Sequence, residues 1–199
     1  HAPELRRDLL KKYVEAGITT DHECSTIEEA LEKISLGMKV IIREGSAARN
    51  LEKLKELYRL HPGMVMLCSD DLHPEMLNKR HISSLVTGLI GEGYDLYDVL
   101  RSVTLNPVKH YKLNTGLLQT GDPADFIVID NLKDFNVKAT YIDGKLVAEN
   151  GRACFDRYIP KDKINAFVAS KIDAEQLHIE PKGTRIRVIE AEDGQLYTR

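Results

Sequence analysis

Three short clusters of ionisable residues in this sequence could together bind a divalent metal ion. They occupy residues 21–23 (Asp-His-Glu), 43–46 (Arg-Glu-Gly-Ser) and 69–73 (Ser-Asp-Asp-Leu-His). Imidazole and carboxylate groups suit Zn²⁺, Mn²⁺ or Fe²⁺ better than an ion that selects thiolates. Such an ion lowers the pKa of bound water towards neutrality, and a neighbouring carboxylate can move the proton. The clusters therefore predict hydrolytic chemistry, without specifying a substrate.

Each cluster also has a simpler structural interpretation. The Asp-His-Glu run could cap a helix and lie in a solvated loop, and Asp70 and Asp71 could cap a helix near Pro74. Arg43 and Glu44 could form a surface ion pair, which contributes little to stability. The functional interpretation is favoured because all three clusters follow predicted strands. A buried charge at a strand end is costly unless it is paired or bound to a metal.

The elements that position these clusters alternate between strand and helix. The alternation is typical of β–α units with parallel strands, whose carboxyl ends form the usual ligand site. A capping box of Ser25 and Glu28 is predicted to open one helix. Strands are predicted at residues 18–22, 38–42 and 64–68, and helices at 4–15, from about 25 to 36, from about 47 to 60, and as two or three helices over 74–111.

Three β–α units cannot close a barrel that needs eight strands. The sequence is therefore either a small open sheet or part of a barrel. In the isolated chain we expect the inner face of the sheet to be exposed and its edges to lack partners, so that the chain self-associates. The apolar residues predicted on that face are Val40, Ile42, Val65 and Leu67.

The pattern changes after Asn114. Residues 116–130 contain a Gly-Asp-Pro turn and a predicted strand at 126–129, and residues 138–148 predict a hairpin around Asp143-Gly144. A last strand is predicted at 185–189. The domain boundaries we expect are 1–115 for the β–α units, 116–150 for a small β segment and 151–199 for a linker and further domain.

Composition excludes several classes of protein. The chain has 199 residues and a formal net charge of −3, which gives no electrostatic reason to expect nucleic acid or a membrane surface as a partner. No apolar run approaches the length of about 20 residues that crosses a membrane. The chain has three cysteines, Cys24, Cys68 and Cys154, and this odd, sparse count favours a reducing, cytoplasmic compartment. They form no C-x-x-C pair, which argues against a thiolate zinc site. Serine-hydrolase, Walker, dinucleotide-binding and H-E-x-x-H motifs do not occur.

Four segments carry a resemblance to a known family: HAPELRRDLLKKYVEAGITTDHE, EALEKISLGMKVIIREGSAARNL, CSDDLHPEML and TLNPVKHYKL. Their order and intervals closely resemble those of bacterial adenine deaminases, which belong to the amidohydrolase superfamily. GLLQTGDPADFIVIDNL and YIDGKLVAENG resemble the β segment that follows the barrel in this superfamily. RIRVIEAEDGQLYTR resembles the entry into an extra C-terminal domain.

The resemblance implies an α/β fold that is the second half of a (β/α)₈ TIM-type barrel, followed by a small β-sandwich segment. Residues 1–115 would then hold strands 5 to 8 with their helices, and the chain would be an incomplete fragment. The first-strand His-x-His pair and the fourth-strand carboxylate of the family have no counterpart here. They would come from the missing N-terminal half of the same barrel.

The resemblance also implies roles for individual residues. His1, His22 and Asp70 match metal-ligand positions, for a dinuclear Mn²⁺ or Fe²⁺ centre with Zn²⁺ as an alternative. Asp70 would also carry the proton, and Glu23 is expected to be catalytic or to contact substrate. The remaining matches near the site, for substrate contact or support of the ligands, are Glu44, Ser46, Asp71 and His73.

The reaction of the family is the hydrolysis of adenine to hypoxanthine and ammonia in purine metabolism, and a homo-oligomer is expected. Two other interpretations stay open from the sequence. Another amidohydrolase, of the dihydroorotase or imidazolone type, would share the metal positions while acting on a different cyclic amide or amidine. The chain taken alone could also be a catalytically inert α/β fragment.

Overall fold

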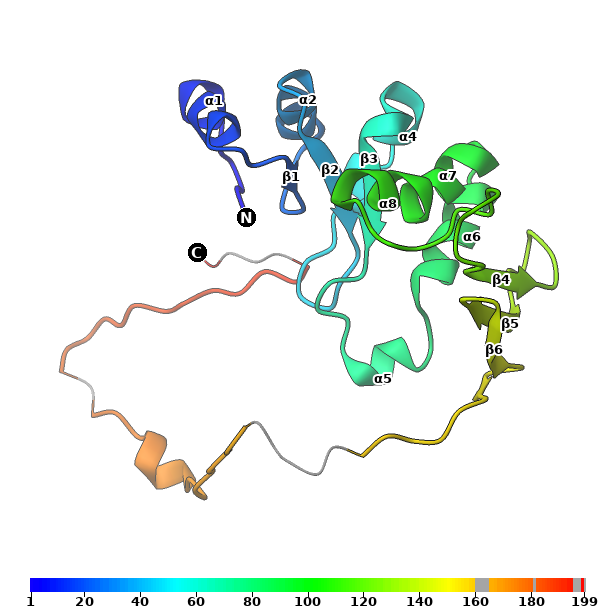
Figure 1. Ribbon diagram of the computed structural model, residues 1–199. Helices are drawn as coiled ribbons and strands as arrows, with labels where there is room; N and C mark the ends of the chain where they lie inside the picture. The colour runs from blue at the N-terminus through cyan, green and yellow to red at the C-terminus, as the bar shows by residue number, and fades with distance from the viewer. Residues whose placement is uncertain (160–164, 181, 195–197, 199) are drawn as a thin grey trace.

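The computed structural model describes residues 1–159, 165–180, 182–194 and 198 (Figure 1). Its first part contains a parallel sheet of three strands in the order β1-β2-β3. In register, Val40 pairs with Val65, and Asp21 pairs with Val40 from the other side. The strands are β1 (Thr20–Asp21), β2 (Lys39–Arg43) and β3 (Val65–Cys68).

Helices connect these strands, as the sequence pattern predicts. The helix α1 (Arg7–Glu15) precedes β1, and α2 (Ile27–Ser35) joins β1 to β2. The predicted helix over 47–60 begins only at Leu51, because residues 44–50 form a loop with a bridge between Glu44 and Arg49. It consists of two short helices, α3 (Leu51–Leu54) and α4 (Leu57–Leu60). A short 3₁₀ turn, η1 (Pro62–Met64), leads into β3.

Four helices, rather than two or three, occupy the segment after β3. They are α5 (Pro74–Leu77), α6 (Ile82–Gly91), α7 (Leu96–Val103) and α8 (Leu105–Tyr111). Asp95 caps α7 by accepting hydrogen bonds from the backbone of Tyr97 and Asp98. Thr104 leaves helical geometry at φ −130° and ψ −80°, which separates α7 from α8.

The cap of α2 lies one residue later than predicted. Thr26 accepts a hydrogen bond from the Glu29 amide at 3.2 Å, and the Glu29 carboxylate accepts one from the Ser25 amide at 3.0 Å. The predicted pair of Ser25 and Glu28 is therefore wrong. The register is set by Glu29, which is buried, whereas Glu28 is exposed.

The core lies between the sheet and its helices. Val40, Ile42, Val65 and Leu67 belong to this core and are at most 8% exposed. The prediction that they lie on an exposed inner face is therefore wrong: they lie on the face of the sheet that the helices cover. The helix residues that pack with them include Leu54, Leu57, Val86, Leu89 and Val99.

A separate antiparallel sheet follows, in the order β4-β5-β6-β7. The predicted hairpin is confirmed, with Asp143 and Gly144 at φ 50° and 72° in its turn. Phe126 and Tyr141 stack across β4 and β5, with ring centroids 4.6 Å apart. The strands are β4 (Phe126–Ile129), β5 (Val137–Ile142), β6 (Lys145–Glu149) and β7 (Arg152–Ala153).

The chain after β7 has little regular structure among its described residues. It contains a 3₁₀ turn, η2 (Ala174–Leu177), and the strand predicted at 185–189 does not form. This segment returns to the first part of the protein, where Arg49 pairs with Asp193 at 3.0 Å (Figure 1). None of the helices described is long and apolar enough to cross a membrane.

Candidate metal centre

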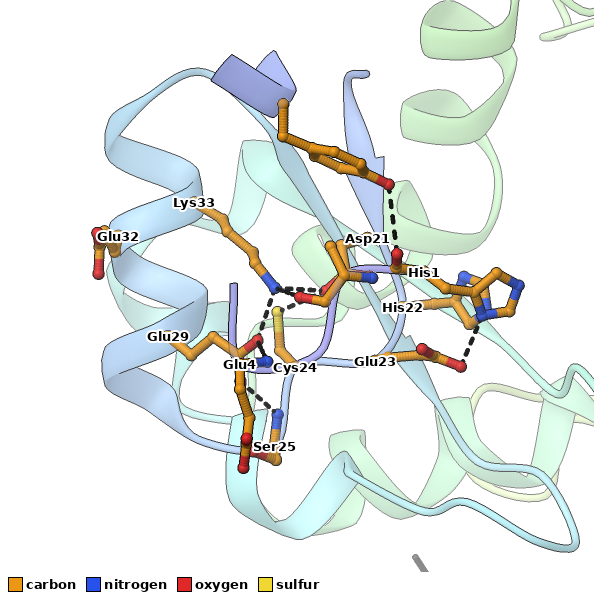
Figure 2. Close-up of polar contacts among 12 residues, drawn as sticks. His1, Glu4, Asp21, His22, Glu23, Cys24, Ser25, Glu29, Glu32 and Lys33 are labelled. Carbon is orange, nitrogen blue, oxygen red and sulfur yellow. Dashed lines mark hydrogen bonds and ion pairs between the residues drawn. The ribbon is translucent and has the colours of Figure 1, made fainter. Parts of the chain in front are cut away.

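His1, His22 and Glu23 come together beside the carboxyl end of β1. Their potential ligand atoms all lie within 4.8 Å of one another. The two imidazole rings have centroids 4.6 Å apart, and His1 Nδ1 lies 2.7 Å from Glu23 Oε1 (Figure 2). His22 and Glu23 follow β1 directly, whereas His1 precedes α1 and belongs to no strand of the described structure. Two imidazoles and a carboxylate form a donor set for Mn²⁺, Fe²⁺ or Zn²⁺.

The Nε2 atom of His22 is the observation that bears on whether this donor set fits a cation. It is buried and has no hydrogen-bond partner within the described part of the chain. Buried polar atoms in folded proteins almost always have a partner, because an unsatisfied one costs free energy. A metal ion coordinated by Nε2 would remove this deficit, since neutral imidazole is a common metal ligand.

Asp70 lies next to this cluster. Its Oδ1 is 3.9 Å from His22 Nε2, and its Oδ2 is 2.6 Å from Nη2 of Arg43. The residue adopts φ 41°, in the left-handed region that costs free energy for a residue with a Cβ. The turn after β3 therefore holds the Asp70 carboxylate towards β1 and β2.

Arg43 is the residue that the sequence interpretation misplaced. It is 4% exposed, so the interpretation as a surface ion pair with Glu44 is wrong. Its guanidinium lies between Asp70, Asp71 at 3.0 Å and Glu23 at 3.6 Å. The available signal was its position as the single cation at the end of a buried strand, between two acidic clusters. Arg43 fixes three carboxylates beside the candidate centre.

Asp71 connects the loop after β2 to the end of β3. Desolvation opposes its ionisation, but hydrogen bonds from the Ala47 amide and from Arg43 outweigh it and lower the pKa of Asp71. A Cβ at position 45 would overlap with Oδ1 of Asp71, so Gly45 permits this close approach. Asp71 therefore contacts Arg43 and does not belong to the cluster of His1, His22 and Glu23.

Glu44, Ser46 and His73 lie farther from that cluster. The Glu44 carboxylate accepts a hydrogen bond from the Leu51 amide at 3.4 Å, and burial raises its pKa. The Ser46 hydroxyl accepts one from the His73 amide at 2.9 Å, while the imidazole of His73 is exposed. The structure therefore gives these residues contacts in the surrounding loops and no contact with the potential ligand atoms.

One cavity borders the cluster, and another lies beside the loop after β2. A cavity of 590 Å³ is lined by His22 and Glu23, together with Glu4, Asn50 and Gly194 among others. The other cavity, of 340 Å³, is lined by Ser46 and His73, and Arg49 borders both cavities. The first cavity has room for a small planar ligand beside the imidazole and carboxylate groups.

Comparison with known proteins gives the relatives of this chain. It is 48% identical to an adenine deaminase of Salinibacter ruber over 198 residues, and 48% identical to one of Methanosarcina mazei. Both alignments cover all of this chain, which spans 36% and 38% of the respective relatives. An adenine deaminase of Sulfurovum sp. is 56% identical over 78% of the chain and 29% of its own length.

Solved structures support the fold. The chain is similar to a beta-aspartyl dipeptidase of Fervidobacterium islandicum AW-1 with a TM-score of 0.59 and 19% identity. That match covers 76% of this chain and 45% of the dipeptidase. Residues 1–147 also match the profile of the amidohydrolase family. Since this match includes both the parallel sheet with the candidate centre and most of the following antiparallel sheet, the chain belongs to the amidohydrolase family.

Proposed function

We propose that this chain is part of a metal-dependent enzyme that hydrolyses adenine to hypoxanthine and ammonia. The observation that carries the proposal is the buried Nε2 of His22, which accepts or donates no hydrogen bond among the described residues and lies in a cluster with His1 and Glu23. The identity to adenine deaminases, 48% over the whole chain, supports adenine as the substrate. Because the chain spans 36–38% of those two relatives, the proposal concerns the whole protein and not residues 1–199 alone.

His1, His22 and Asp70 are the residues that would hold the metal. A dinuclear Mn²⁺ or Fe²⁺ centre is our first choice, with Zn²⁺ as the alternative, because imidazole and carboxylate ligands accept all three. A divalent ion bound here would lower the pKa of water so that hydroxide is available near neutral pH. The remaining ligands would come from a part of the protein outside this chain.

The other groups of this chain orient the substrate and move the proton. Asp70, held by Arg43 beside His22, would accept the proton of the attacking water and deliver it to the departing amine. Glu23 lines the larger cavity, where its carboxylate can accept a hydrogen bond from a purine N–H. We assign support of these groups to Glu44, Ser46, Asp71 and His73.

We also propose the architecture that the sequence resemblance implies. Residues 1–115 would be strands 5 to 8 of a (β/α)₈ barrel with their helices, 116–150 a β-sandwich segment, and 151–199 a linker and the start of another domain. The parallel order β1-β2-β3 supports the barrel, and strands from an N-terminal half would pair with its edges. A cytoplasmic homo-oligomer stays a prediction.

The test is the metal content of the full-length protein that contains these residues. His22→Ala should lower the bound metal per protein and abolish adenine hydrolysis while circular dichroism stays unchanged. Asp98→Asn, which breaks an ion pair on α7, is the control and should retain both. Unchanged metal content in His22→Ala would contradict the proposed centre. If the protein hydrolyses another cyclic amide or amidine but not adenine, the proposed substrate is wrong and that compound takes its place.

A further inference from the structure

A fully buried lysine lies directly behind the candidate centre. The side chain of Lys33, on α2, has no exposed surface. Its ammonium group donates to Asp21 at 2.7 Å, to Glu29 at 2.6 Å and to the carbonyl of Ala2 at 2.6 Å (Figure 2). These three acceptors satisfy its three hydrogens. Lysine is almost never fully buried unless it is paired, so this position is unusual.

The acidic groups around Lys33 could be mistaken for a second metal site. Ligand atoms of Asp21, Cys24 and Glu29 lie within 4.8 Å of one another. Lys33, however, already supplies the positive charge that these carboxylates need. Burial would raise the pKa of Asp21, but the hydrogen bond and charge of Lys33 outweigh burial and lower it. The group is an internal ion network.

This network binds the segment that carries His1. The amide of Ala2 donates to Asp21 Oδ1 at 3.1 Å, while its carbonyl accepts from Lys33. The amide of Glu4 donates to Glu29 Oε1 at 2.8 Å. Both polar backbone groups of the residue next to His1 are therefore bound to the network.

The same network binds the loop that carries His22 and Glu23. Asp21 directly precedes His22, and the thiol of Cys24 donates to Asp21 Oδ2 at 3.3 Å. The amide of Ser25 donates to Glu29 Oε2 at 3.0 Å. Figure 2 shows the two chain segments meeting at Lys33, with the imidazoles of His1 and His22 on the side away from it.

We propose that Lys33 is a positioning residue that fixes His1 against His22 and Glu23, and so sets the metal affinity of the centre. Lys33 itself contacts neither metal nor substrate. The inference rests on the proposed metal centre. It goes beyond it by naming the network that binds both the backbone next to His1 and the loop of His22 and Glu23. Groups behind metal ligands typically change affinity by about 10- to 100-fold when removed, because they fix the orientation of the ligands.

The experiment replaces Lys33 in the full-length protein. Lys33→Met keeps most of the volume but leaves Asp21 and Glu29 without a counter-charge and Ala2 without its donor. We expect the dissociation constant for Mn²⁺, measured by chelator competition on folded protein, to rise by about tenfold or more. Val99→Ala is the control, since it creates a cavity in the core on α7 and should lower stability without changing Mn²⁺ affinity.

A second measurement needs no metal. In metal-free protein, amide hydrogen exchange at Glu4 should accelerate in Lys33→Met but not in Val99→Ala. If Lys33→Met does not fold, Glu29→Gln leaves Lys33 paired with Asp21 and removes charge from the acceptor of the Glu4 amide. That variant should show the same two changes, a weaker affinity for Mn²⁺ and faster exchange at Glu4.

The outcomes separate this inference from the proposed function. If the wild-type protein binds no metal, or if His22→Ala binds it normally, the proposed centre is wrong and the inference falls with it. If the wild type binds Mn²⁺ and His22→Ala does not, but the Lys33 and Glu29 variants bind it as tightly as Val99→Ala, only the inference is overturned. A merely structural role for Lys33 would give that second result.

Discussion

Arg43 determines where the acidic side chains of the candidate centre lie. One guanidinium holds Asp70 and Asp71 and lies 3.6 Å from Glu23, so three carboxylates from two chain segments converge on it. Burial of this charge is tolerable because the carboxylates pair with it. The arrangement keeps Asp70 close to His22 while Nε2 of His22 makes no hydrogen bond among the described residues.

Asp70→Asn tests the role of this carboxylate. An amide retains the shape of the side chain but cannot accept and release a proton, and it is a weaker metal ligand. We therefore expect the full-length variant to fold and to lose adenine hydrolysis by several orders of magnitude in kcat. Retention of more than about a tenth of the wild-type kcat, a barrier change of about 1.4 kcal/mol, would contradict the assignment.

Residue types could be predicted from the sequence better than residue contacts. The clusters after the strands were visible because they combine ionisable groups with a strand boundary. The buried positions of Arg43 and Lys33 were not visible, because both residue types are usually exposed. Lys33 lies four residues after Glu29 on α2, a spacing that also brings ion pairs together on the exposed face of a helix. Only tertiary structure shows that the pair faces inward.

At the scale of elements, Asp125 connects the loop before β4 to the β5–β6 hairpin. Its carboxylate accepts hydrogen bonds from the amides of Asp143 and Gly116 and from the hydroxyl of Thr115, at 2.7, 2.9 and 3.0 Å. These hydrogen bonds favour the charged form and lower the pKa of Asp125 below its usual value. The contribution of this group to stability is therefore present above the unfolded-state pKa and is lost as the pH falls through the lower, folded-state pKa.

Asp125→Asn should weaken the antiparallel sheet at neutral pH, because an amide nitrogen cannot accept these hydrogen bonds. The difference in amide-exchange protection of β4 and β5 between wild type and variant should begin to shrink as the pH falls below the usual carboxyl pKa of about 4. It should disappear only below the lower folded-state pKa, where the wild-type carboxylate is protonated in the folded protein. Substitution of the exposed Asp156 by Asn is the matched control and should leave protection unchanged. If the difference in protection between wild type and variant stays constant with pH, the charge of Asp125 does not stabilise the antiparallel sheet.

Elements with strong local signals were predicted correctly, and the errors come from tertiary contacts. The three parallel strands and the Asp143-Gly144 hairpin follow from apolar runs and a turn pair that specify local structure. The helix predicted over 47–60 begins late, at Leu51, because the side chain of Asn50 binds the backbone of Arg43 and Cys24. The expected strand at 185–189 has a suitable composition, but no neighbouring strand pairs with it in the described structure.

At the scale of the whole molecule, the parallel sheet ends at β1 and at β3 with no further strand among the described residues. Unpaired strand edges promote association between chains. We expect residues 1–199 alone to be inactive towards adenine and to self-associate, which light scattering coupled to size-exclusion chromatography would detect. Adenine hydrolysis by this chain, free of any longer form, would contradict the expectation, as would a monodisperse monomer with a bound dinuclear metal.

The buried thiol of Cys24 can serve as a chemical probe of how often the interior of this protein opens. Cys24 is 1% exposed, and desolvation raises its pKa, whereas Cys154 is exposed. Because the thiolate is the form that reacts, iodoacetamide should modify Cys154 first and Cys24 only after the surrounding structure opens. Burial also raises the pKa of Cys68, to about 11, so this thiol should react more slowly than that of Cys154. The alkylation rate of Cys24, followed by mass spectrometry, therefore reports how often the loop bearing His22 separates from α2.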